Sequence, residues 1–419
     1  MAIDLLNLGT TADDRTGDTF RAGGTKINAM FTELYAFKDS ESFVFVSQES
    51  EFPVQDATTI TLESQKLYVT TAAISTAKRF VVQDAAVLTS FNVLGPVLEY
   101  TGTGSMFTGS DVSFIIKDIQ ISHPNSQGFN FTDTIGNIYL YVNESVRTVS
   151  GSKYGTFNNM QTASISGSSS LDMDDGVTFT GANQSVVSFN QFFMQSTSAS
   201  FIGADLGTSI ALTWEFTDLI LVGPAGSIGI SGAASSANVT AGAEATVTGG
   251  NFTNVTTPLS GITVDDIRWE FSDNAGISDS LEDGLLSFNG SVTVTTITTI
   301  NTPVIVNATW AVIRSSKFTG TTGGRLTFNG QRSITVPIDV AIGIISVGGG
   351  SIDVSIYLAK NGSVITASKT TVAISGTTQR TLSIPWQDSI STNDYYEIYV
   401  ENNSGTTNVI VETGRLRIR

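Results

Sequence analysis

Residues able to carry out acid–base or nucleophilic chemistry are sparse in this sequence. It contains one histidine, His123, and no cysteine. A thiol nucleophile, a cysteine-based zinc site and a multi-histidine metal site are therefore excluded within one chain. His123 lies in a Ser-His-Pro-Asn stretch, which is typical of a turn. A Ser-His-Asp triad remains an alternative, but we expect a loop histidine that faces solvent.

Carboxylates are the more serious candidates for catalysis. Enzymes that cleave glycans use two Asp or Glu side chains roughly 5–9.5 Å apart. Four acidic residues lie close together in the sequence: Asp265, Asp266, Glu270 and Asp279. Adjacent residues of a strand point to opposite faces, so Asp265 and Asp266 would not converge. We therefore favour capping and turn formation at a domain junction for this group, with a catalytic pair as the alternative.

Other ligand-binding patterns are weak. The segment Asp172–Gly176 is similar to the start of a calcium loop but lacks the other ligands and the glutamate at the twelfth position. No phosphate-binding glycine loop is present. We predict no bound metal and no cofactor. Tryptophans can stack on sugar rings, but core or subunit packing is the favoured role for all four. They are Trp214, Trp269, Trp310 and Trp386.

Composition excludes several classes of partner. Of the 419 residues, 14% are charged and 40% are hydrophobic, and the net charge is -17. Nucleic-acid binding needs a basic surface, and there is no Lys/Arg cluster before the last few residues. The negative charge also disfavours anionic membranes, and no apolar run is long enough to span one. A surface of hydroxyls and amides is typical of a long-lived extracellular β protein.

The first 40 residues contain the only convincing helical pattern. Apolar residues recur at helical spacing from Ile27 to Phe37, so we predict a helix over Thr25–Phe37. About four turns are not stable alone in water. The apolar stripe must therefore pack on another chain, on the same helix of sister chains, or back on its own domain.

These residues also resemble the N-terminal module of tailed-bacteriophage fibre, tailspike and appendage proteins. The resemblance implies a virion protein, assembled in the host cytoplasm, whose residues 1–40 attach it to other virion proteins. Arg15 departs from the pattern, where a small residue is expected. The matching residues are Asn7-Leu8-Gly9-Thr10, Asp13-Asp14, Thr16-Gly17-Asp18, Phe20-Arg21, Gly23-Gly24, Lys26-Ile27-Asn28 and Phe31-x-Glu33-Leu34-Tyr35. The predicted docking and trimer contacts are Leu8, Phe20, Ile27, Met30, Phe31, Leu34 and Tyr35.

Residues 41–290 are predicted to form a shaft of short strands. Runs such as Phe43–Val46 and Thr59–Leu62 are β-branched or aromatic, and turn residues separate nearly every pair. No long helix interrupts them, which excludes βαβ folds. We favour a β-solenoid, and stacked sandwiches are the alternative. The spacing between similar segments is irregular, with no fixed-length repeat.

The C-terminal part has longer and more regular strands. We predict a linker at residues 291–306 and a jelly-roll or β-sandwich head at 307–419. The sequence Lys360-Asn361-Gly362-Ser363 predicts a two-residue hairpin, because Asn-Gly tolerates the positive φ of a type I′ turn. The stretches Tyr357–Gly362 and Tyr395–Val400 resemble those of trimeric C1q/TNF-like heads.

Together these patterns predict an all-β homotrimeric fibre or spike-like appendage of a tailed phage, without enzymatic activity. It would attach to a host cell-surface glycan or protein. Two alternatives remain: a tailspike glycan depolymerase with a carboxylate pair on the shaft, and a capsid or neck appendage without a receptor role. Receptor contacts are expected on polar loops of the head. The candidate residues are Asn361, Trp386, Asn393 and Asn403.

Overall fold

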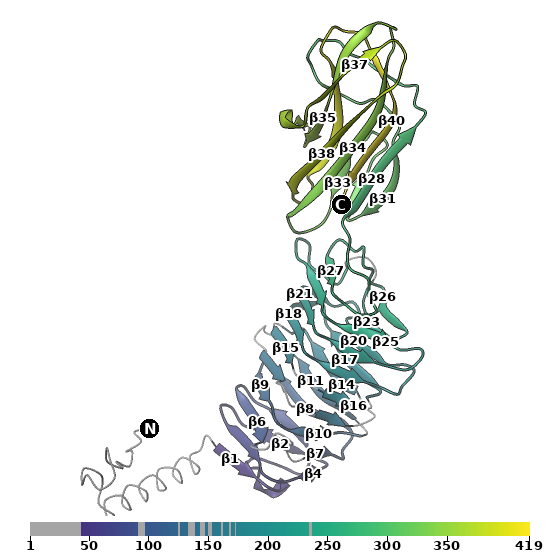
Figure 1. Ribbon diagram of the computed structural model, residues 1–419. Helices are drawn as coiled ribbons and strands as arrows, with labels where there is room; N and C mark the ends of the chain where they lie inside the picture. Colours follow the sequence, from purple (N-terminus) through teal and green to yellow (C-terminus); the bar gives the residue numbers. More distant parts are fainter. Residues whose placement is uncertain are drawn as a thin grey trace, which may run out of the picture. The chain divides into compact units, whose positions relative to one another are not determined.

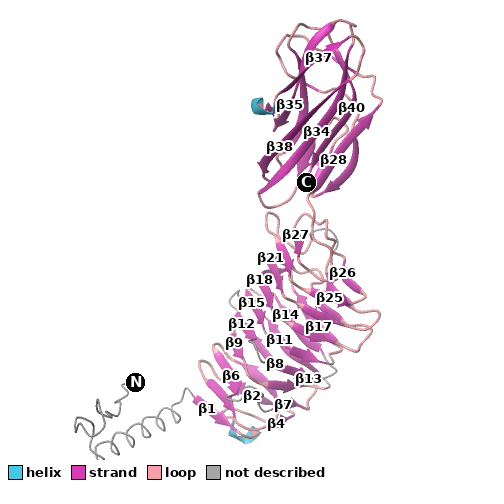
Figure 2. Cartoon of the chain, in the orientation of Figure 1, coloured by secondary structure: helices cyan, strands magenta, loops and turns pink. Residues whose placement is uncertain are grey.

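The computed structural model describes residues 43–90, 97–124, 126–132, 139–142, 147–149, 153–160, 162–166, 169–171, 173–233 and 237–419. Within these ranges, regular structure is almost entirely strand (Figure 2), and the only helical segments are two 3₁₀ turns. These are η1 (Glu49–Glu51) and η2 (Thr366–Ser368). The predicted N-terminal helix lies outside the described residues. So do its predicted contacts Leu8, Phe20, Ile27, Met30, Phe31, Leu34 and Tyr35.

The chain divides into two compact units. One, here called the solenoid unit, comprises the described residues up to Ala211 with Glu215–Gly232 and Gly250–Ser260. The other, here called the C-terminal unit, comprises Leu212–Trp214, Ala233–Gly249 and Gly261–Arg419. Each unit is built from strands that bury one face.

The shaft is a β-solenoid of three parallel sheets (Figure 1), which confirms the favoured prediction over stacked sandwiches. From β3 onward the chain visits the first, second and third sheet in a fixed cycle. The first sheet contains β1 (Phe43–Val46), β3 (Leu67–Thr70), β6 (Ala86–Ser90), β9 (Ser113–Ile116), β12 (Tyr139–Val142), β15 (Thr162–Ser166), β18 (Asn183–Asn190), β21 (Ile210–Thr217), β24 (Ala245–Thr248) and β27 (Trp269–Ser272).

The second sheet contains β4 (Ile74–Thr76), β7 (Val97–Tyr100), β10 (Gln120–Ser122), β13 (Arg147–Val149), β16 (Ser169–Leu171), β19 (Phe193–Gln195), β22 (Ile220–Val222) and β25 (Asn251–Asn254). The third sheet contains β2 (Thr59–Leu62), β5 (Arg79–Val82), β8 (Gly104–Ser110), β11 (Ser126–Thr132), β14 (Lys153–Asn158), β17 (Asp175–Thr180), β20 (Ile202–Asp205), β23 (Ile228–Ser231) and β26 (Thr257–Ser260).

The coils of the solenoid differ in length. Tyr68 pairs with Leu88 of the next coil, and Leu88 in turn pairs with Ile116, which is a longer step along the sequence. The step from Ala163 to its partner Val187 lies between these two. The turns between strands absorb the difference, while the strands keep their register. This explains why the sequence shows similar segments but no fixed repeat.

Stacked aromatic rings fill much of the solenoid core. Phe107 is fully buried, and its ring stacks on Phe80 at 5.1 Å and on Phe129 at 5.5 Å between centroids. These three residues occupy the same position in successive coils, because parallel strands in register place equivalent side chains above one another. One apolar column therefore joins neighbouring coils.

Two corners of the solenoid require a left-handed backbone. Residues just after strands of the first and third sheets have φ near +50° in several coils, for example Asp111 (54°), Asn159 (53°), Gln191 (52°) and Asp218 (51°). Asn and Asp tolerate this conformation better than other residues with a side chain. A polar residue followed by Asn, Asp or Gly and then an apolar residue is thus the sequence mark of a corner.

The C-terminal unit contains an antiparallel β-sandwich (Figure 1). One sheet has the order β31-β28-β40-β34-β38, with β29 also on β40, and the other has the order β32-β33-β39-β35-β36, with β30 on β39 and β37 on β35. The first sheet's strands are β28 (Asp283–Asn289), β29 (Val294–Thr295), β31 (Ala311–Ser316), β34 (Ile334–Ser346), β38 (Arg380–Ile390) and β40 (Val409–Ile418). The second sheet's strands are β30 (Val304–Ile305), β32 (Phe318–Gly320), β33 (Leu326–Phe328), β35 (Ser351–Lys360), β36 (Ser363–Val364), β37 (Thr370–Ser375) and β39 (Tyr395–Asn402).

The predicted domain boundary is too late in the sequence. Residues up to 290 were assigned to the shaft, but β28 pairs with β40 and β31, and Leu286 is buried in the sandwich core. The predicted linker at 291–306 supplies β29 and β30 to the two sheets. Alternation of apolar residues predicts a strand in 283–289, but the pattern is the same whichever sheet receives it.

The Asn-Gly hairpin is confirmed. Lys360 pairs with Ser363, and the two residues between them, Asn361 and Gly362, have φ of 53° and 76°. Positive φ at both central positions is the requirement of a type I′ turn. The sequence alone was sufficient here because the signal is confined to neighbouring residues.

Candidate functional site

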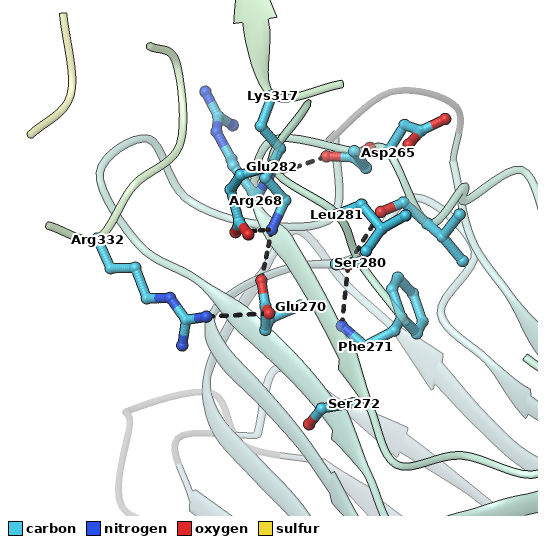
Figure 3. A network of polar contacts seen from close by, with 12 residues as sticks. Asp265, Arg268, Glu270, Phe271, Ser272, Ser280, Leu281, Glu282, Lys317 and Arg332 are labelled. Carbon is cyan, nitrogen blue, oxygen red and sulfur yellow. Dashed lines mark hydrogen bonds and ion pairs between the residues drawn. The ribbon is translucent and has the colours of Figure 1, made fainter. Parts of the chain in front are cut away.

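The acidic residues that sequence analysis singled out lie in an ion-pair network of the C-terminal unit (Figure 3). Glu270, on β27, is 8% exposed and binds Lys317 Nζ through Oε2 and Arg332 NH2 through Oε1 at 3.0 Å. Lys317 is 3% exposed and also lies 3.5 Å from Glu282. Both Glu270 oxygens are thus occupied by cations, which leaves neither oxygen free to exchange a proton with a substrate.

Of the neighbouring aspartates, two accept backbone N–H groups close in the sequence and one accepts a distant side-chain hydroxyl. Asp265 Oδ1 accepts a hydrogen bond from Ser316 Oγ at 2.7 Å. Asp266 Oδ1 accepts one from the backbone N–H two residues later, at 3.1 Å. Asp279 Oδ1 accepts one from the backbone N–H six residues earlier, at 2.9 Å. Asp266 and Asp279 thus have the capping role that we favoured from the sequence. Asp265 and Glu270 instead bind side chains that are distant in the sequence, which the sequence did not predict.

His123 is buried rather than facing solvent, which corrects the sequence-based expectation. It lies just after β10, and its ring is fully inaccessible. Its Nδ1 is 3.4 Å from the carbonyl oxygen of Ser126. Burial lowers the pKa of the imidazole to about 4, so it is neutral at pH 7. The predicted turn is present at His123–Ser126. Whether its side chain points into the core or to solvent depends on how the coil folds, which the turn sequence does not show.

A groove on the solenoid brings carboxylates of two coils together. It measures about 580 Å³ and lies along the outer face of the third sheet, across β5, β8 and β11. Asp84 and Asp111 both line it, each from the corner that follows the strand of its coil, β5 for Asp84 and β8 for Asp111. Asp84 is exposed and Asp111 is half-buried. The lining also includes polar side chains, among them Thr108, Asn130 and Thr132, and the valines Val81, Val82 and Val112.

Sequence analysis missed this pair because Asp84 and Asp111 lie a full coil apart in the sequence. Asp84 is anchored by accepting the backbone N–H of Ser113, from the next coil, at 2.9 Å. The corner pattern described above marks Asp111, which has φ of 54°. Coil length, and not local spacing, decides which two corners come into register.

The tryptophans are not available for stacking on sugars. Trp214 and Trp269 are fully buried, and Trp310 is 2% exposed. Trp386 is half-buried and packs against the sandwich core from β38. The predicted core role therefore holds for three of them, and the proposed receptor contact at Trp386 would use a side chain that mostly faces inward.

The other receptor candidates are divided between the two ends of the sandwich. Asn361 and Asn393 lie at the end where β28 begins, since β35 ends and β39 begins there. The Asn361 side chain donates to Asp394 Oδ1 at 2.7 Å and accepts the N–H of Tyr395 at 2.9 Å. Its amide therefore supports the loop.

Asn403 lies at the opposite end, where β39 ends and β40 begins. Its side-chain nitrogen donates to Ser355 Oγ at 2.8 Å. The buried Asn402 beside it accepts the N–H groups of Ser404 and Gly405 at 2.9 and 3.1 Å, and donates to the carbonyl of Thr407 at 3.0 Å. These bonds hold the loop in one conformation.

The described residues contain neither a metal-binding cluster nor a helical membrane span. In the described ranges, no three His, Asp or Glu side chains form a group that could hold a metal ion. The same part of the chain has no helix with the length and hydrophobicity of a membrane span.

Comparison with known proteins gives remote structural resemblances only. No protein-family model and no curated protein matches the sequence. Among solved structures, murine APRIL is similar over 33% of this chain and 99% of its own, with 7% identity and a TM-score of 0.24. Eiger TNF from S. frugiperda is similar over 33% of this chain and 93% of its own, with 10% identity and a TM-score of 0.22. The enzymatically active domain of bacteriophage CBA120 tailspike protein 4 is similar over 84% of this chain and 64% of its own, with 10% identity and a TM-score of 0.18.

Proposed function

We propose that this chain is a structural virion protein of a tailed phage, a homotrimeric fibre or spike-like appendage that attaches the particle to its host. The observation that carries the proposal is the combination in one charge-poor chain of a β-solenoid and an antiparallel sandwich. The N-terminal pattern from Asn7 to Tyr35 supports it. Such a protein works mechanically, and several copies held together multiply weak contacts into avidity.

The order of strands supports a jelly-roll form for the head. Taken in chain order as strands A to H, β28, β33, β34, β35, β37, β38, β39 and β40 form one sheet with the order A-H-C-F and another with the order B-G-D-E. Consecutive strands thus mostly alternate between the two sheets, as in an eight-stranded jelly roll. Heads of this form suit a compact cap at the end of an appendage.

Trimer formation is tested by light scattering on the full-length chain. We expect a particle of three times the 44.2 kDa chain mass. A monomeric mass at micromolar concentration would contradict the trimer.

Attachment to the particle is tested in the N-terminal module. Placing charges on the predicted apolar stripe with Phe31→Asp and Leu34→Asp should cost several kcal/mol if that stripe is buried against another chain. We expect folded protein that is missing from purified particles. Thr32→Asp, off the stripe, is the matched control. Normal copy number on the double-variant particles would remove the docking role.

Host attachment is tested by competition for host cells. The full-length chain should slow phage adsorption, and exchange of the loop Asn402–Thr407 for a Gly-Ser loop of equal length should weaken that effect. This loop is rigid, polar and free of charge, and such loops on β scaffolds commonly carry binding. No effect of the intact chain on adsorption would favour a capsid or neck appendage without a receptor role.

A second candidate function is glycan cleavage in the solenoid groove. Two carboxylates, Asp84 and Asp111, line this groove, and a retaining glycosidase uses two carboxylates roughly 5 Å apart. Asp84 and Asp111 would then form the pair. Release of reducing ends from host polysaccharide, lost in Asp84→Asn and in Asp111→Asn, would establish it. No release by the unaltered chain would eliminate it.

A further inference from the structure

The first sheet of the solenoid ends at β27, and the outer edge of this strand needs hydrogen-bond partners. Among the described strands, β27 pairs with β24 alone. The carbonyl groups of Arg268 and Ser272 accept N–H groups from the β24 side, at 2.8 and 3.1 Å. Backbone groups of alternate residues point to opposite edges of a strand, so those of Phe271 point to the edge where a further coil would pair. Such an edge can add a strand from another molecule.

A single serine satisfies both backbone groups of Phe271 (Figure 3). The N–H of Ser280 donates to the Phe271 carbonyl at 2.8 Å, and the Phe271 N–H donates to Ser280 Oγ at 3.1 Å. The Ser280 hydroxyl in turn donates to the carbonyl of Val264 at 2.9 Å, which fixes its orientation. Ser280 is 8% exposed, and Phe271 is fully buried. Ser280 therefore makes, with its N–H and its hydroxyl, the contacts that a further coil would otherwise make.

The chain on either side of Ser280 is held at the same edge, and we call residues 279–282 the cap segment. Asp279 Oδ1 accepts the N–H of Asp273, the residue that follows β27, at 2.9 Å. At the other end of the segment, Lys317 Nζ lies 3.5 Å from Glu282 and also binds Glu270 of β27. Lys317 thus joins the cap segment to the strand that it covers.

The cap segment ends the ladder of hydrogen bonds. Inside the first sheet a strand lies on either side, as β3 and β9 do for β6, and each strand presents a second row of N–H and C=O groups to the next coil. The Ser280 side chain closes the Phe271 N–H without presenting such a row. The sheet therefore stops at β27 because a side chain, and not a strand, occupies its edge.

Addition of a strand to β27 would have to displace these contacts. It would break both hydrogen bonds between Phe271 and Ser280 and leave the buried serine without them. It would also separate Glu282 from Lys317, a cation that is 3% exposed. Both costs oppose the exchange of the cap segment for a new strand.

The strand that the cap segment excludes is one from a second copy of the chain. Every copy contains the same parallel sheet, so its strands match the spacing and direction of an open β27 edge. Head-to-tail addition of this kind does not close on itself and gives open filaments. A net charge of -17 on each copy opposes such contacts only at low ionic strength, since salt screens it.

We propose that the cap segment is an autoinhibitory contact, which terminates the first sheet and keeps a second copy of the chain from adding a strand to β27. Ser280 is the residue on which this contact depends most, because it satisfies both backbone groups of Phe271. The role concerns assembly of the chain and is independent of any host receptor.

The first measurement is hydrogen exchange of the Phe271 amide in the full-length chain, by mass spectrometry of peptides that span β27. Ser280→Ala removes the acceptor and should speed this exchange by ~5-fold or more, as expected for the loss of one hydrogen bond. Ser280→Thr keeps the hydroxyl and should stay within ~2-fold of the unaltered chain. Ser333→Ala is the matched control, because it removes an exposed hydroxyl that bonds Ser391 at 2.6 Å, away from β27.

The second measurement is sedimentation velocity of the same chains over a wide range of concentration at physiological salt. The mass of Ser280→Ala should rise with concentration while its near-ultraviolet circular dichroism is retained. The unaltered chain, Ser280→Thr and Ser333→Ala should each keep one mass. Unchanged Phe271 exchange in Ser280→Ala, or faster exchange without any growth in mass, would overturn the proposal.

Glu282→Gln keeps the test decisive if Ser280→Ala does not fold. This variant loosens the cap segment at Lys317 and leaves Ser280 in place. A mass that grows with concentration, more weakly than expected for Ser280→Ala, would support the proposal. A constant mass together with faster exchange at Phe271 would contradict it.

Discussion

The solenoid and the sandwich both bury one face of each strand, but they differ in how far apart paired strands lie in the sequence. In the solenoid, strands pair with those of the next coil, as Tyr68 does with Leu88. In the sandwich, the first strand pairs with the last, and Leu285 lies opposite Arg417. The solenoid can therefore vary each coil locally, whereas the sandwich exists only when its two ends meet.

The two regions also treat buried polar groups differently. All the charged residues that are buried within the described ranges belong to the C-terminal unit: Asp266, Glu270, Lys317, Glu397 and Glu401. The solenoid unit instead buries a neutral histidine, His123. Glu270 lies on β27, the last strand of the first solenoid sheet, and its partner Lys317 comes from the segment between β31 and β32 of the sandwich. Opposite charges from distant segments therefore meet inside the C-terminal unit.

The largest expected effect tests whether 283–289 belongs to the sandwich. Leu286→Asp buries a charge in the core and should cost several kcal/mol, comparable to the whole stability of a domain. Leu285→Asp, one residue earlier and facing outward, is the matched control and should cost little. We expect protease sensitivity of the sandwich only in Leu286→Asp, with the solenoid resistant. Equal protease sensitivity of the two variants would contradict the assignment of 283–289 to the sandwich.

The next effect tests the charged core of the C-terminal unit. Lys317→Met leaves Glu270 buried beside Arg332 alone and should destabilise the unit by ~3–5 kcal/mol. Arg332→Met removes an exposed partner of the same carboxylate and should cost less than ~1 kcal/mol. The urea midpoint followed by near-ultraviolet circular dichroism gives the comparison. Similar midpoints for both variants would show that burial of Lys317 does not determine how much its ion pair with Glu270 contributes to stability.

The third effect is a pH dependence confined to the solenoid. In the folded chain burial depresses the His123 pKa to about 4, so the unfolded chain binds a proton that the folded chain does not between pH 6.5 and 4. Stability from this group is therefore complete above pH 6.5 and falls by ~2–4 kcal/mol as the pH drops to 4. His123→Gln should lose less on acidification than the unaltered chain.

The stability lost between pH 7 and pH 4.5 is compared for the unaltered chain and His123→Gln. Both have the same carboxylates, so the effect of carboxylate titration cancels. Hydrogen exchange of strands β10 and β11 reports the coil around His123. An equal loss of protection in the two chains on acidification would remove the histidine from the explanation.

The smallest effect tests the one feature that needs no tertiary context. Asn361 has φ of 53°, so Asn361→Ala should cost ~1 kcal/mol more than Asn361→Gly, which adopts this conformation freely. Both variants lose the hydrogen bond to Asp394, so the difference isolates backbone strain. Thermal denaturation of the sandwich measures it. A less stable glycine variant would contradict the turn assignment.

The sequence by itself determined the features that depend on neighbours in the chain. Alternation of β-branched and aromatic residues with turn residues predicted an all-β chain with a solenoid shaft and a sandwich, and Asn361-Gly362 predicted a type I′ hairpin. The roles of Asp266 and Asp279 followed from the same local reasoning, because capping is a contact between a side chain and nearby backbone.

Only the tertiary structure decided which distant residues meet. Alternation of side chains defines the two faces of a strand but does not show which sheet the strand joins, so 283–289 was assigned to the shaft. A turn sequence likewise does not show whether its side chains are buried, so His123 was assigned to solvent. Coils of unequal length decide which corner residues meet, and they place Asp84 and Asp111 in one groove. The pairing of β30 and β35 with β39 likewise gathers Ile305, Tyr357 and Tyr399 into one row. The register of two strands depends on how many residues separate them and on the path these residues take. No local sequence pattern gives that information.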